Sequence, residues 1–387
     1  MKANMKPSRI GRFHFEPYLV VVVFSLLLIG YVMVGSASLH KSADAFNYLR
    51  KQSINIGIGL TAGFLITRVQ IKFWEKNGQS FFLFGLLLLI IVLLPGVGKE
   101  VNGSTRWLEL GSFRFQVSEV VKYFSVIYMA GYVTRHQKTI RDSAFSLIKP
   151  MLLFGIACLL LLMEPDFGSA VVILTIAMGI MYLAGARLIQ FTTLLGVLAF
   201  LATVLIAIAP YRVRRVTSFL SPFDHPKDTG YQLVHALISF GRGEWIGVGL
   251  GSGVEKVFYL PEGHTDFLFS VIAEELGLLG VLTVIGLFTV FVWRTFLIAE
   301  AAEQIGEKFS AYIAYGVGIW FGFQTLVNMG VNMGVLPTKG LTLPLMSYGG
   351  GSMLIMCCTV ALLFRVHSEI QEIKANKPKE RSKWVAV

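Results

Sequence analysis

A cluster of titratable residues, Glu262, His264 and Asp266, lies where a hydrophilic stretch gives way to an apolar run. An acid at the start of a helix either caps the free N–H groups of the first turn or points into a cleft toward a substrate. Ser270 and Glu274 follow Asp266 at intervals of four residues, so on a helix the three share one face, with Glu274 roughly 12 Å deeper. Because ionisable groups at that depth are costly, this stripe favours function over capping. We interpret Asp266 as the candidate catalytic base, and Ser270 and Glu274 as its support.

The composition is typical of an integral membrane protein. Of the 387 residues, 55% are hydrophobic and 15% are charged, whereas about 25% of residues are charged in soluble domains. The net charge of +11 could suit nucleic acid, but the basic residues form short clusters between apolar runs, as expected at a membrane surface. We therefore exclude a nucleic-acid partner. Cys158, Cys357 and Cys358 fall inside apolar runs, and no Cys/His spacing suits zinc, so neither a disulfide framework nor a protein metal site is predicted.

Ten apolar segments near the length that a bilayer requires predict an all-α, polytopic membrane protein with about ten transmembrane helices. The distribution of Lys and Arg places the N-terminal segment 1–16 and the tail 367–387 in the cytoplasm, on either side of one membrane domain over 17–366. The large loop 211–264, between the seventh and eighth helices, is then extracytoplasmic. The predicted spans are 17–37, 53–70, 80–97, 116–134, 148–164, 168–186, 189–210, 265–296, 310–331 and 346–366.

Two shorter segments on the same outer side carry charged residues. Arg106 beside Trp107 is either an interfacial anchor or a phosphate clamp next to an aromatic platform for a sugar. Glu119 and Lys122 are three residues apart at the start of the fourth span, so they could neutralise each other on one helix face. Asp166 lies in a tight turn between two helices, where we favour a helix-capping role.

The loop 211–264 is too long to be a simple connector. Arg215 lies in a basic cluster at its start, where it would attract lipid head groups or bind a pyrophosphate. Residues 231–240 predict an amphipathic or re-entrant helix. The alternating glycines of 247–253 resemble a phosphate loop, but no strand precedes them and no Gly-Lys-Ser/Thr follows, so we favour a flexible hinge. Lys256 then leads into the acidic cluster.

A second irregular stretch, 336–352, contains Pro337, Pro344 and three consecutive glycines, which prevent a continuous helix. Backbone polar groups beside a membrane must line a cavity or pack against protein, so we expect this stretch to do one or the other. Lys339 is its only charged residue.

Four strings in this order make the chain similar to the SEDS family of bacterial shape, elongation, division and sporulation proteins. They are Asn-Gly-Ser-x-Arg-Trp at 102–107, Pro-Asp-x-Gly-Ser at 165–169, Pro-Glu-x-His-Thr-Asp-Phe at 261–267 and Ser-Tyr-Gly-Gly at 347–350. Within the family, residues 336–344 resemble the division members more than the elongation members. Two departures are Val117, where proline is common, and Gly351, which replaces one serine.

The resemblance implies a peptidoglycan glycosyltransferase that polymerises lipid II at the outer face of the bacterial cytoplasmic membrane, at the division septum. It implies as partners lipid II, the growing undecaprenyl-pyrophosphate glycan, a class B penicillin-binding transpeptidase and other division proteins. Asp266 maps onto the family's catalytic Asp and would deprotonate the acceptor 4-hydroxyl. The expected substrate-binding residues are Arg106, Trp107, Arg215, Lys256, Glu262, His264, Thr265, Lys339 and Ser347, and the expected supporting residues are Glu119, Lys122, Asp166, Ser270 and Glu274.

Charge neutralisation at the leaving pyrophosphate requires a cationic clamp, and a divalent cation, magnesium or manganese, could share that task although the sequence shows no dedicated cage. A helix N-terminus lowers the pKa of Asp266, whereas burial beside Glu262 raises it. A base that works near neutral pH requires the second effect to dominate.

Two other functions compete with polymerisation. A lipid II flippase would use Glu274 and the irregular ninth and tenth segments as a midplane site, but the ionisable residues gather at one surface. A scaffold that only anchors division partners would leave the polar stripe below Asp266 unexplained.

Overall fold

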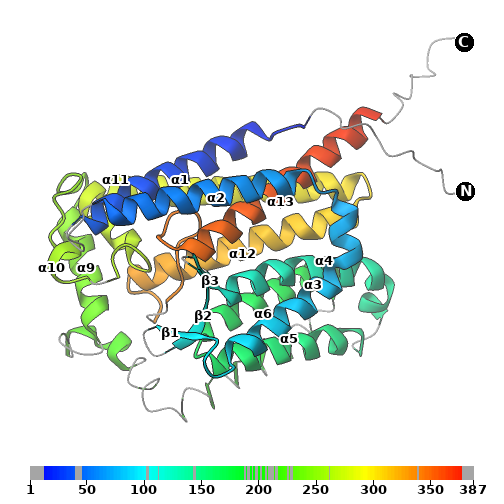
Figure 1. The fold of residues 1–387 in the computed structure, drawn as a ribbon, viewed down its shortest axis with the longest axis horizontal. Helices are drawn as coiled ribbons and strands as arrows, with labels where there is room; N and C mark the ends of the chain where they lie inside the picture. Colours follow the sequence, from blue (N-terminus) through cyan, green and yellow to red (C-terminus); the bar gives the residue numbers. More distant parts are fainter. Residues whose placement is uncertain are drawn as a thin grey trace, which may run out of the picture.

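The computed structural model describes residues 13–39, 46–101, 104–111, 113–142, 145–186, 230–260, 262–337 and 340–376, with part of the residues between 187 and 229. In this part of the chain, long helices lie side by side along one direction, and both ends of the described chain lie at the same end of the bundle (Figure 1). The long helices are α1 (Pro17–Ser38), α2 (Asn47–Thr67), α3 (Ile71–Val92), α4 (Val117–Asp142), α5 (Phe145–Met163), α6 (Phe167–Leu183), α11 (Leu268–Gln304), α12 (Lys308–Asn332) and α13 (Gly350–Asn376).

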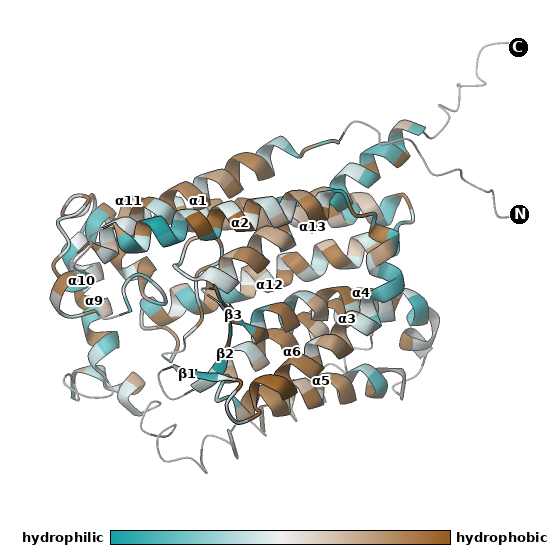
Figure 2. Cartoon of the chain, viewed as in Figure 1, coloured by the Kyte–Doolittle hydropathy of each residue, from teal (hydrophilic) through white to brown (hydrophobic). Residues whose placement is uncertain are grey.

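The helices are apolar on their outer surfaces as well as between them (Figure 2). Large side chains such as Phe24, Leu65 and Leu87 are exposed on α1, α2 and α3. A helix that is apolar all round is stable at the periphery of a bundle only where lipid surrounds it. Among the described helices, α1, α3, α11 and α13 are long and apolar enough to cross a membrane. The chain has the predicted fold of a polytopic helical membrane protein, and the predicted seventh span lies largely outside the described residues.

Several helices begin or end beyond the predicted spans. α3 begins at Ile71 rather than at residue 80, and α11 ends at Gln304 rather than at 296. The added turns contain Lys, Glu and Gln, which have high helix propensity and suit the polar boundary of a bilayer, so hydropathy alone misplaces the ends. α13 likewise continues to Asn376, past the predicted boundary of the tail.

A small antiparallel sheet, absent from the all-helical prediction, precedes α4. Its strand order is β1-β2-β3, with Trp107 opposite Gln116 and Glu109 opposite Arg114. Gly111 turns the chain between the second and third strands with a φ of 64°, a conformation that favours glycine. Because the third strand runs directly into α4, the sheet is held at the helix end. The strands are β1 (Lys99–Val101), β2 (Ser104–Leu110) and β3 (Phe113–Gln116).

α11 is broken at Gly277, where φ is 63° and ψ is −161°. The loop after α9 (Tyr231–Gly243) satisfies the backbone groups that the break exposes. Val248 N donates to Glu274 O at 3.0 Å, and Leu278 N donates to Glu244 O at 2.9 Å. A Cβ atom at Gly277 would collide with the backbone of this loop. The glycine-rich stretch 247–253 is therefore docked against α11, and its interpretation as a flexible hinge is wrong.

Candidate functional site

Asp266 lies in the turn before α11, which begins at Leu268. The helix has no side-chain cap, so the capping role considered for Asp266 is wrong. Gly340, in the irregular stretch after α12, faces the carboxylate, because a Cβ atom added there would lie 3.0 Å from Asp266 Oδ2. The described part of this stretch, from residue 340 on, thus lies against Asp266 and packs against the site, as expected for irregular backbone at a membrane.

Two asparagines of α12 hold the backbone of Asp266. Asn328 Nδ2 and Asn332 Nδ2 donate to Asp266 O at 2.9 and 3.0 Å. Asn332 Oδ1 in turn accepts from Ser270 N at 3.1 Å and from Ser270 Oγ at 2.7 Å. Ser270 therefore supports the position of Asp266, as predicted, but through Asn332. The four-residue spacing of the two asparagines was a signal that sequence reasoning missed.

The other residues of the acidic cluster order the turn itself. Thr265 Oγ1 donates to Glu262 Oε2 at 2.6 Å, and Ser347 Oγ donates to Thr265 O at 2.6 Å. Tyr348 N donates to His264 O at 3.0 Å, and the two rings lie with their centroids 5.6 Å apart. The structure thus brings Glu262, His264, Thr265 and Ser347 together beside Asp266.

The electrostatic environment of Asp266 favours a base that works near neutral pH. The pKa of Asp266 is raised to about 7, mainly by burial and next by the neighbouring negative charge of Glu262, whereas Arg106 lowers it. Asp166 contributes a smaller upward shift of the same pKa. Since the ordinary pKa of Asp is about 3.9, burial outweighs any effect of the helix terminus, as the sequence argument required.

Arg106 projects from β2 toward the end of α5. Its Nη1 lies 3.9 Å from Asp166 Oδ1, and its buried Nε has no hydrogen-bond partner among the described residues. Asp166 Oδ1 also accepts from Ser169 N at 3.1 Å, which confirms the predicted helix cap. Arg106 therefore lies beside the carboxylate of Asp166, and its Nε remains a donor without a partner among the described residues, as a site for an anionic ligand such as a phosphate requires.

Trp107 follows Arg106 on the same strand. Successive side chains of a strand point to opposite faces, so the indole does not lie beside the guanidinium of Arg106. The pairing of an aromatic platform with a phosphate clamp stays a prediction for these two residues.

Glu164 precedes the turn that contains Asp166, and the sequence predicted no role for it in the site. It is fully buried, and neither carboxyl oxygen has a hydrogen-bond partner among the described residues. Burial raises the pKa of Glu164 to about 8, with Asp166 adding to the increase and Arg106 opposing it. At neutral pH this side chain is mostly the neutral acid.

Glu119 and Lys122 form a buried ion pair on α4, with Lys122 Nζ 2.7 Å from Glu119 Oε1. Lys122 Nζ also donates to Gln324 Oε1 at 3.1 Å, and Gln324 Nε2 donates to Thr342 O at 2.9 Å. The two charges neutralise each other, as one interpretation of the sequence proposed. The pair also connects α4 through α12 to the stretch that crosses Asp266.

Glu274 does not support Asp266. Its Oε1 accepts from Val254 N at 2.9 Å and lies 3.6 Å from Arg242 Nε. The side chain thus faces the loop after α9, which docks where α11 breaks at Gly277. The predicted polar stripe therefore ends at Ser270, although α11 stays helical through Glu274 and breaks only at Gly277.

Lys256, in the short helix α10 (Glu255–Phe258), is buried and already paired. Its Nζ forms an ion pair with Glu275 Oε1 and donates to Ser36 Oγ at 2.7 Å. Ser36 Oγ also donates to Glu275 Oε2 at 2.7 Å. This ammonium is therefore not available as the expected pyrophosphate clamp, because a buried charge needs its counter-charge.

Two expected cationic residues, Arg215 and Lys339, lie outside the described residues. Within the part of the chain that the structure describes, no group of three or more His, Cys, Asp or Glu could hold a metal ion. The three cysteines are free and buried, consistent with small apolar residues.

The profile of the FtsW/RodA/SpoVE family, described as cell cycle protein, matches residues 17–372. The chain belongs to this family. The SEDS resemblance found in the sequence is thereby confirmed.

Curated relatives in the FtsW/RodA/SpoVE family match nearly the whole chain. A probable peptidoglycan glycosyltransferase FtsW of Methylomonas methanica is 57% identical over 98% of this chain and 99% of its own length. A protein of the same name from Methylococcus capsulatus is 54% identical over 93% of this chain and 91% of its own length.

Solved structures agree in fold. A chain of a peptidoglycan synthase complex, whose structure concerns the coordination of polymerization and crosslinking, has a TM-score of 0.78 and 29% identity. The match covers 92% of this chain and 98% of that chain. The rod shape determining protein RodA of Thermus thermophilus has a TM-score of 0.69 and 28% identity, with the same coverage.

Proposed function

We propose that this chain polymerises lipid II into glycan strands, with Asp266 as the general base. The chain is a peptidoglycan glycosyltransferase by its membership of the FtsW/RodA/SpoVE family and its close FtsW relatives. The observation that carries the role of Asp266 is its environment. Two asparagines hold the backbone oxygen of Asp266, and the pKa of its carboxyl is raised to about 7. The carboxyl does not cap α11.

The proposed step is a single displacement at the anomeric carbon of the donor. Asp266 takes the proton of the acceptor 4-hydroxyl, the resulting oxygen forms the bond to the anomeric carbon, and the bond to the pyrophosphate oxygen breaks. The electron pair leaves with the pyrophosphate, and the α-linked donor becomes a β-linked polymer. With a pKa near 7, Asp266 then releases its proton to water at neutral pH.

Arg106 is the described residue best suited to the departing pyrophosphate. It lies beside the carboxylate of Asp166, and its Nε has no partner among the described residues. Preorganised cations stabilise charge that develops in the transition state. Lys339 and a divalent cation are proposed to share this role, since Lys339 directly precedes Gly340, which faces Asp266.

We further propose that a class B penicillin-binding transpeptidase and other division proteins are the partners, since a peptidoglycan synthase complex is a structural neighbour. Both ends of the described chain lie at one end of the bundle (Figure 1), which supports cytoplasmic termini and a site at the outer face. The proposed location is the cytoplasmic membrane at the division septum.

The flippase alternative is weakened by the contacts of Glu274, its expected midplane residue, which is engaged with the loop after α9. Detergent micelles separate the two functions, because lipid II has no opposite leaflet to reach there.

The deciding experiment is polymerisation of labelled lipid II by the purified chain with a transpeptidase partner in detergent. Asp266→Asn should lose about 10²–10⁴-fold in rate, the usual contribution of a general base. Glu300→Gln, an exposed acid near the far end of α11, is the matched control and should keep wild-type activity. Full activity of Asp266→Asn with a normal unfolding temperature would exclude Asp266 as the base.

A further inference from the structure

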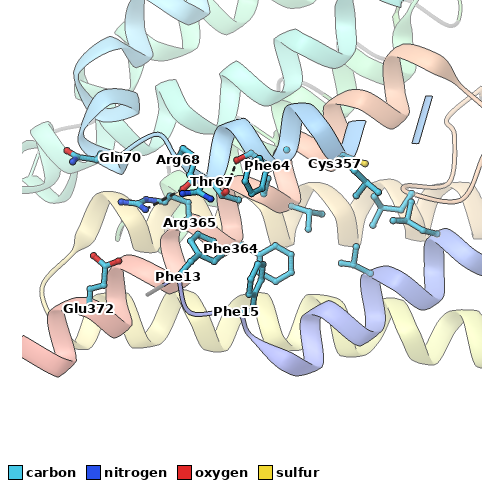
Figure 3. Close-up of a pocket in the computed structure, with 17 residues that line it drawn as sticks. Phe13, Phe15, Phe64, Thr67, Arg68, Gln70, Cys357, Phe364, Arg365 and Glu372 are labelled. Carbon is cyan, nitrogen blue, oxygen red and sulfur yellow. Dashed lines mark hydrogen bonds between the residues drawn. The ribbon is translucent and has the colours of Figure 1, made fainter. Parts of the chain in front are cut away.

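A cavity of about 520 Å³ lies between α1, α2 and α13, toward the end of the bundle where both ends of the described chain lie (Figure 3). Its volume is within the range of small-molecule sites, about 300–1,000 Å³. None of the residues placed around Asp266 above lines it. The cavity is therefore separate from the candidate catalytic site.

The lining of this cavity is divided by polarity. Figure 3 shows Gln70, Arg68, Arg365 and Glu372 at one end and Cys357 at the other. Between Arg365 and Cys357, α13 rises about 12 Å at 1.5 Å per residue. The cavity thus has a polar mouth and an apolar interior, which matches the polar and apolar ends of an amphiphilic ligand. The apolar lining includes Val23, Leu27, Leu60, Phe64, Val360, Ala361 and Phe364.

Of the charged side chains at the mouth, one has an ion-pair partner and two have none among the described residues. Arg365 is paired with Glu369 at 2.8 Å. Arg68 instead lies over the ring of Phe64, with its Cζ 4.7 Å from the centroid, and no described carboxylate is within ion-pair distance of it. Glu372 also has no ion pair within the described residues. The mouth therefore offers one cation and one anion, which balance each other.

We propose that this cavity binds one acyl chain of a phospholipid whose headgroup carries both a phosphate and an amine, such as phosphatidylethanolamine. The phosphate accepts from the guanidinium of Arg68, and the amine donates to Glu372. Arg is suited to phosphate because its planar fork donates two parallel hydrogen bonds. A purely anionic headgroup would satisfy Arg68 but would place its negative charge near Glu372 and Glu369, which disfavours it.

The far end of the cavity reaches the stretch that crosses Asp266. Leu345 lines the cavity, is buried and has a φ of 62°, which is strained for a leucine. The same stretch places Gly340 against Asp266. An acyl chain in the cavity would pack beneath Leu345 and help to hold this stretch in place. Binding of the lipid does not depend on the chemistry proposed for Asp266.

The headgroup assignment is tested by lipid competition on the full-length chain. The purified protein is mixed with equal amounts of phosphatidylethanolamine and phosphatidylglycerol in detergent, and retained lipid is counted by native mass spectrometry. We expect one phosphatidylethanolamine per chain. Arg68→Gln should weaken retention about tenfold or more, the effect of one lost hydrogen bond to a charged group. Lys72→Gln, an exposed cation that does not line the cavity, should retain lipid as wild type does.

The cavity itself is tested by filling it. Leu60→Trp places a large ring inside, whereas Leu65→Trp changes an exposed leucine on the same helix that does not line the cavity. Leu60 is 54% exposed and Leu65 is 62% exposed, so both variants should keep the wild-type unfolding temperature. We expect only Leu60→Trp to lose the lipid.

Three results would overturn the proposal: equal retention of the two lipids, wild-type retention by Leu60→Trp, or no phospholipid on the purified chain. The last is expected if a segment of another protein covers the cavity. Because the readout is bound lipid, failure here is distinguishable from failure of the polymerase assay.

Discussion

Two acidic residues near the start of α11 have opposite environments. Asp266 lies before the helix with its backbone oxygen held by two asparagines and its carboxyl facing Gly340. Glu275, nine residues later, is surrounded by donors: an ion pair with Lys256, a hydrogen bond from Ser36 Oγ and one from Gly251 N at 3.1 Å. The first carboxyl is positioned through its backbone, whereas the second is saturated through its side chain.

This difference separates a chemical role from an architectural one. A carboxylate that must take a proton needs an exposed lone pair and a raised pKa, which burial without a paired cation provides. A carboxylate that joins segments needs every oxygen satisfied, because a buried charge without partners is costly. Asp266 fits the first requirement. Glu275 fits the second, since it ties α1, α10 and the docked glycine-rich loop to one helix.

The largest stability effect is expected at the saturated site. Glu275→Gln leaves the buried ammonium of Lys256 without a counter-charge and should destabilise the protein by about 3–5 kcal/mol. Thermal unfolding in detergent measures the loss. The double variant Lys256→Met with Glu275→Leu removes both charges and should recover most of it. If Glu275→Gln instead unfolds as wild type does but loses polymerase activity, the ion pair belongs to the catalytic machinery.

A smaller and more specific effect is expected in the pH profile. Since Asp266 must be deprotonated to act, kcat/KM for lipid II should rise with pH through about 7, the raised pKa of Asp266. Glu262→Gln removes the neighbouring charge that contributes to this raised pKa, so the acidic limb should move to lower pH by a fraction of a pH unit.

Glu274→Gln is the matched control for that shift. Its carboxylate contacts Val254 N and Arg242 rather than the site, so the variant should lose thermal stability while the acidic limb stays where it is. If the acidic limb of the pH profile moved in Glu274→Gln but not in Glu262→Gln, then Glu274 and not Glu262 would be the acid that raises the pKa of Asp266.

Sequence reasoning succeeded where a property is local to the chain. The length and hydropathy of each apolar run predicted the helical membrane fold, and the position of Asp266 at the start of such a run predicted its place before α11. The opposing effects of burial and of the helix terminus on the pKa of Asp266 could also be predicted, because both effects depend on residues nearby in the sequence. The small sheet was missed since its strands lie in a short polar loop between two long apolar runs.

Sequence reasoning failed where a side chain's partner comes from a distant segment. Glu274 was assigned to the site by its spacing from Asp266, and Lys256 by its place before the acidic cluster. The docked loop after α9 engages Glu274 instead, and Glu275 pairs with Lys256. Asn328 and Asn332 were overlooked, since an asparagine in an apolar helix carries no charge signal. Only the packing of α12 against the turn reveals that they hold Asp266.

Glu164 extends the comparison to a third buried acid. Unlike Glu275, it has no hydrogen-bond partner among the described residues, and unlike Asp266 it is fully buried. Its pKa is raised to about 8, mainly by burial. In the unfolded chain its pKa is near the ordinary value of about 4.3. The folded state therefore holds a proton that the unfolded state releases, so wild-type stability should fall as pH rises from about 4.3 to about 8 and level off above that.

Glu164→Gln keeps the shape of the neutral acid but cannot ionise. At pH 4 the variant should unfold at nearly the wild-type temperature, because Glu164 is protonated there in both the folded and the unfolded wild-type chain. At pH 8.5 it should be the more stable protein, since only the wild type buries a carboxylate beside Asp166. Unfolding temperatures at the two pH values give the result directly, and Glu109→Gln, in an exposed cross-strand ion pair, controls for generic loss of an acid. A variant that is no more stable than wild type at pH 8.5 would show that Arg106 compensates the ionised form, and Glu164 would then belong with the paired acids.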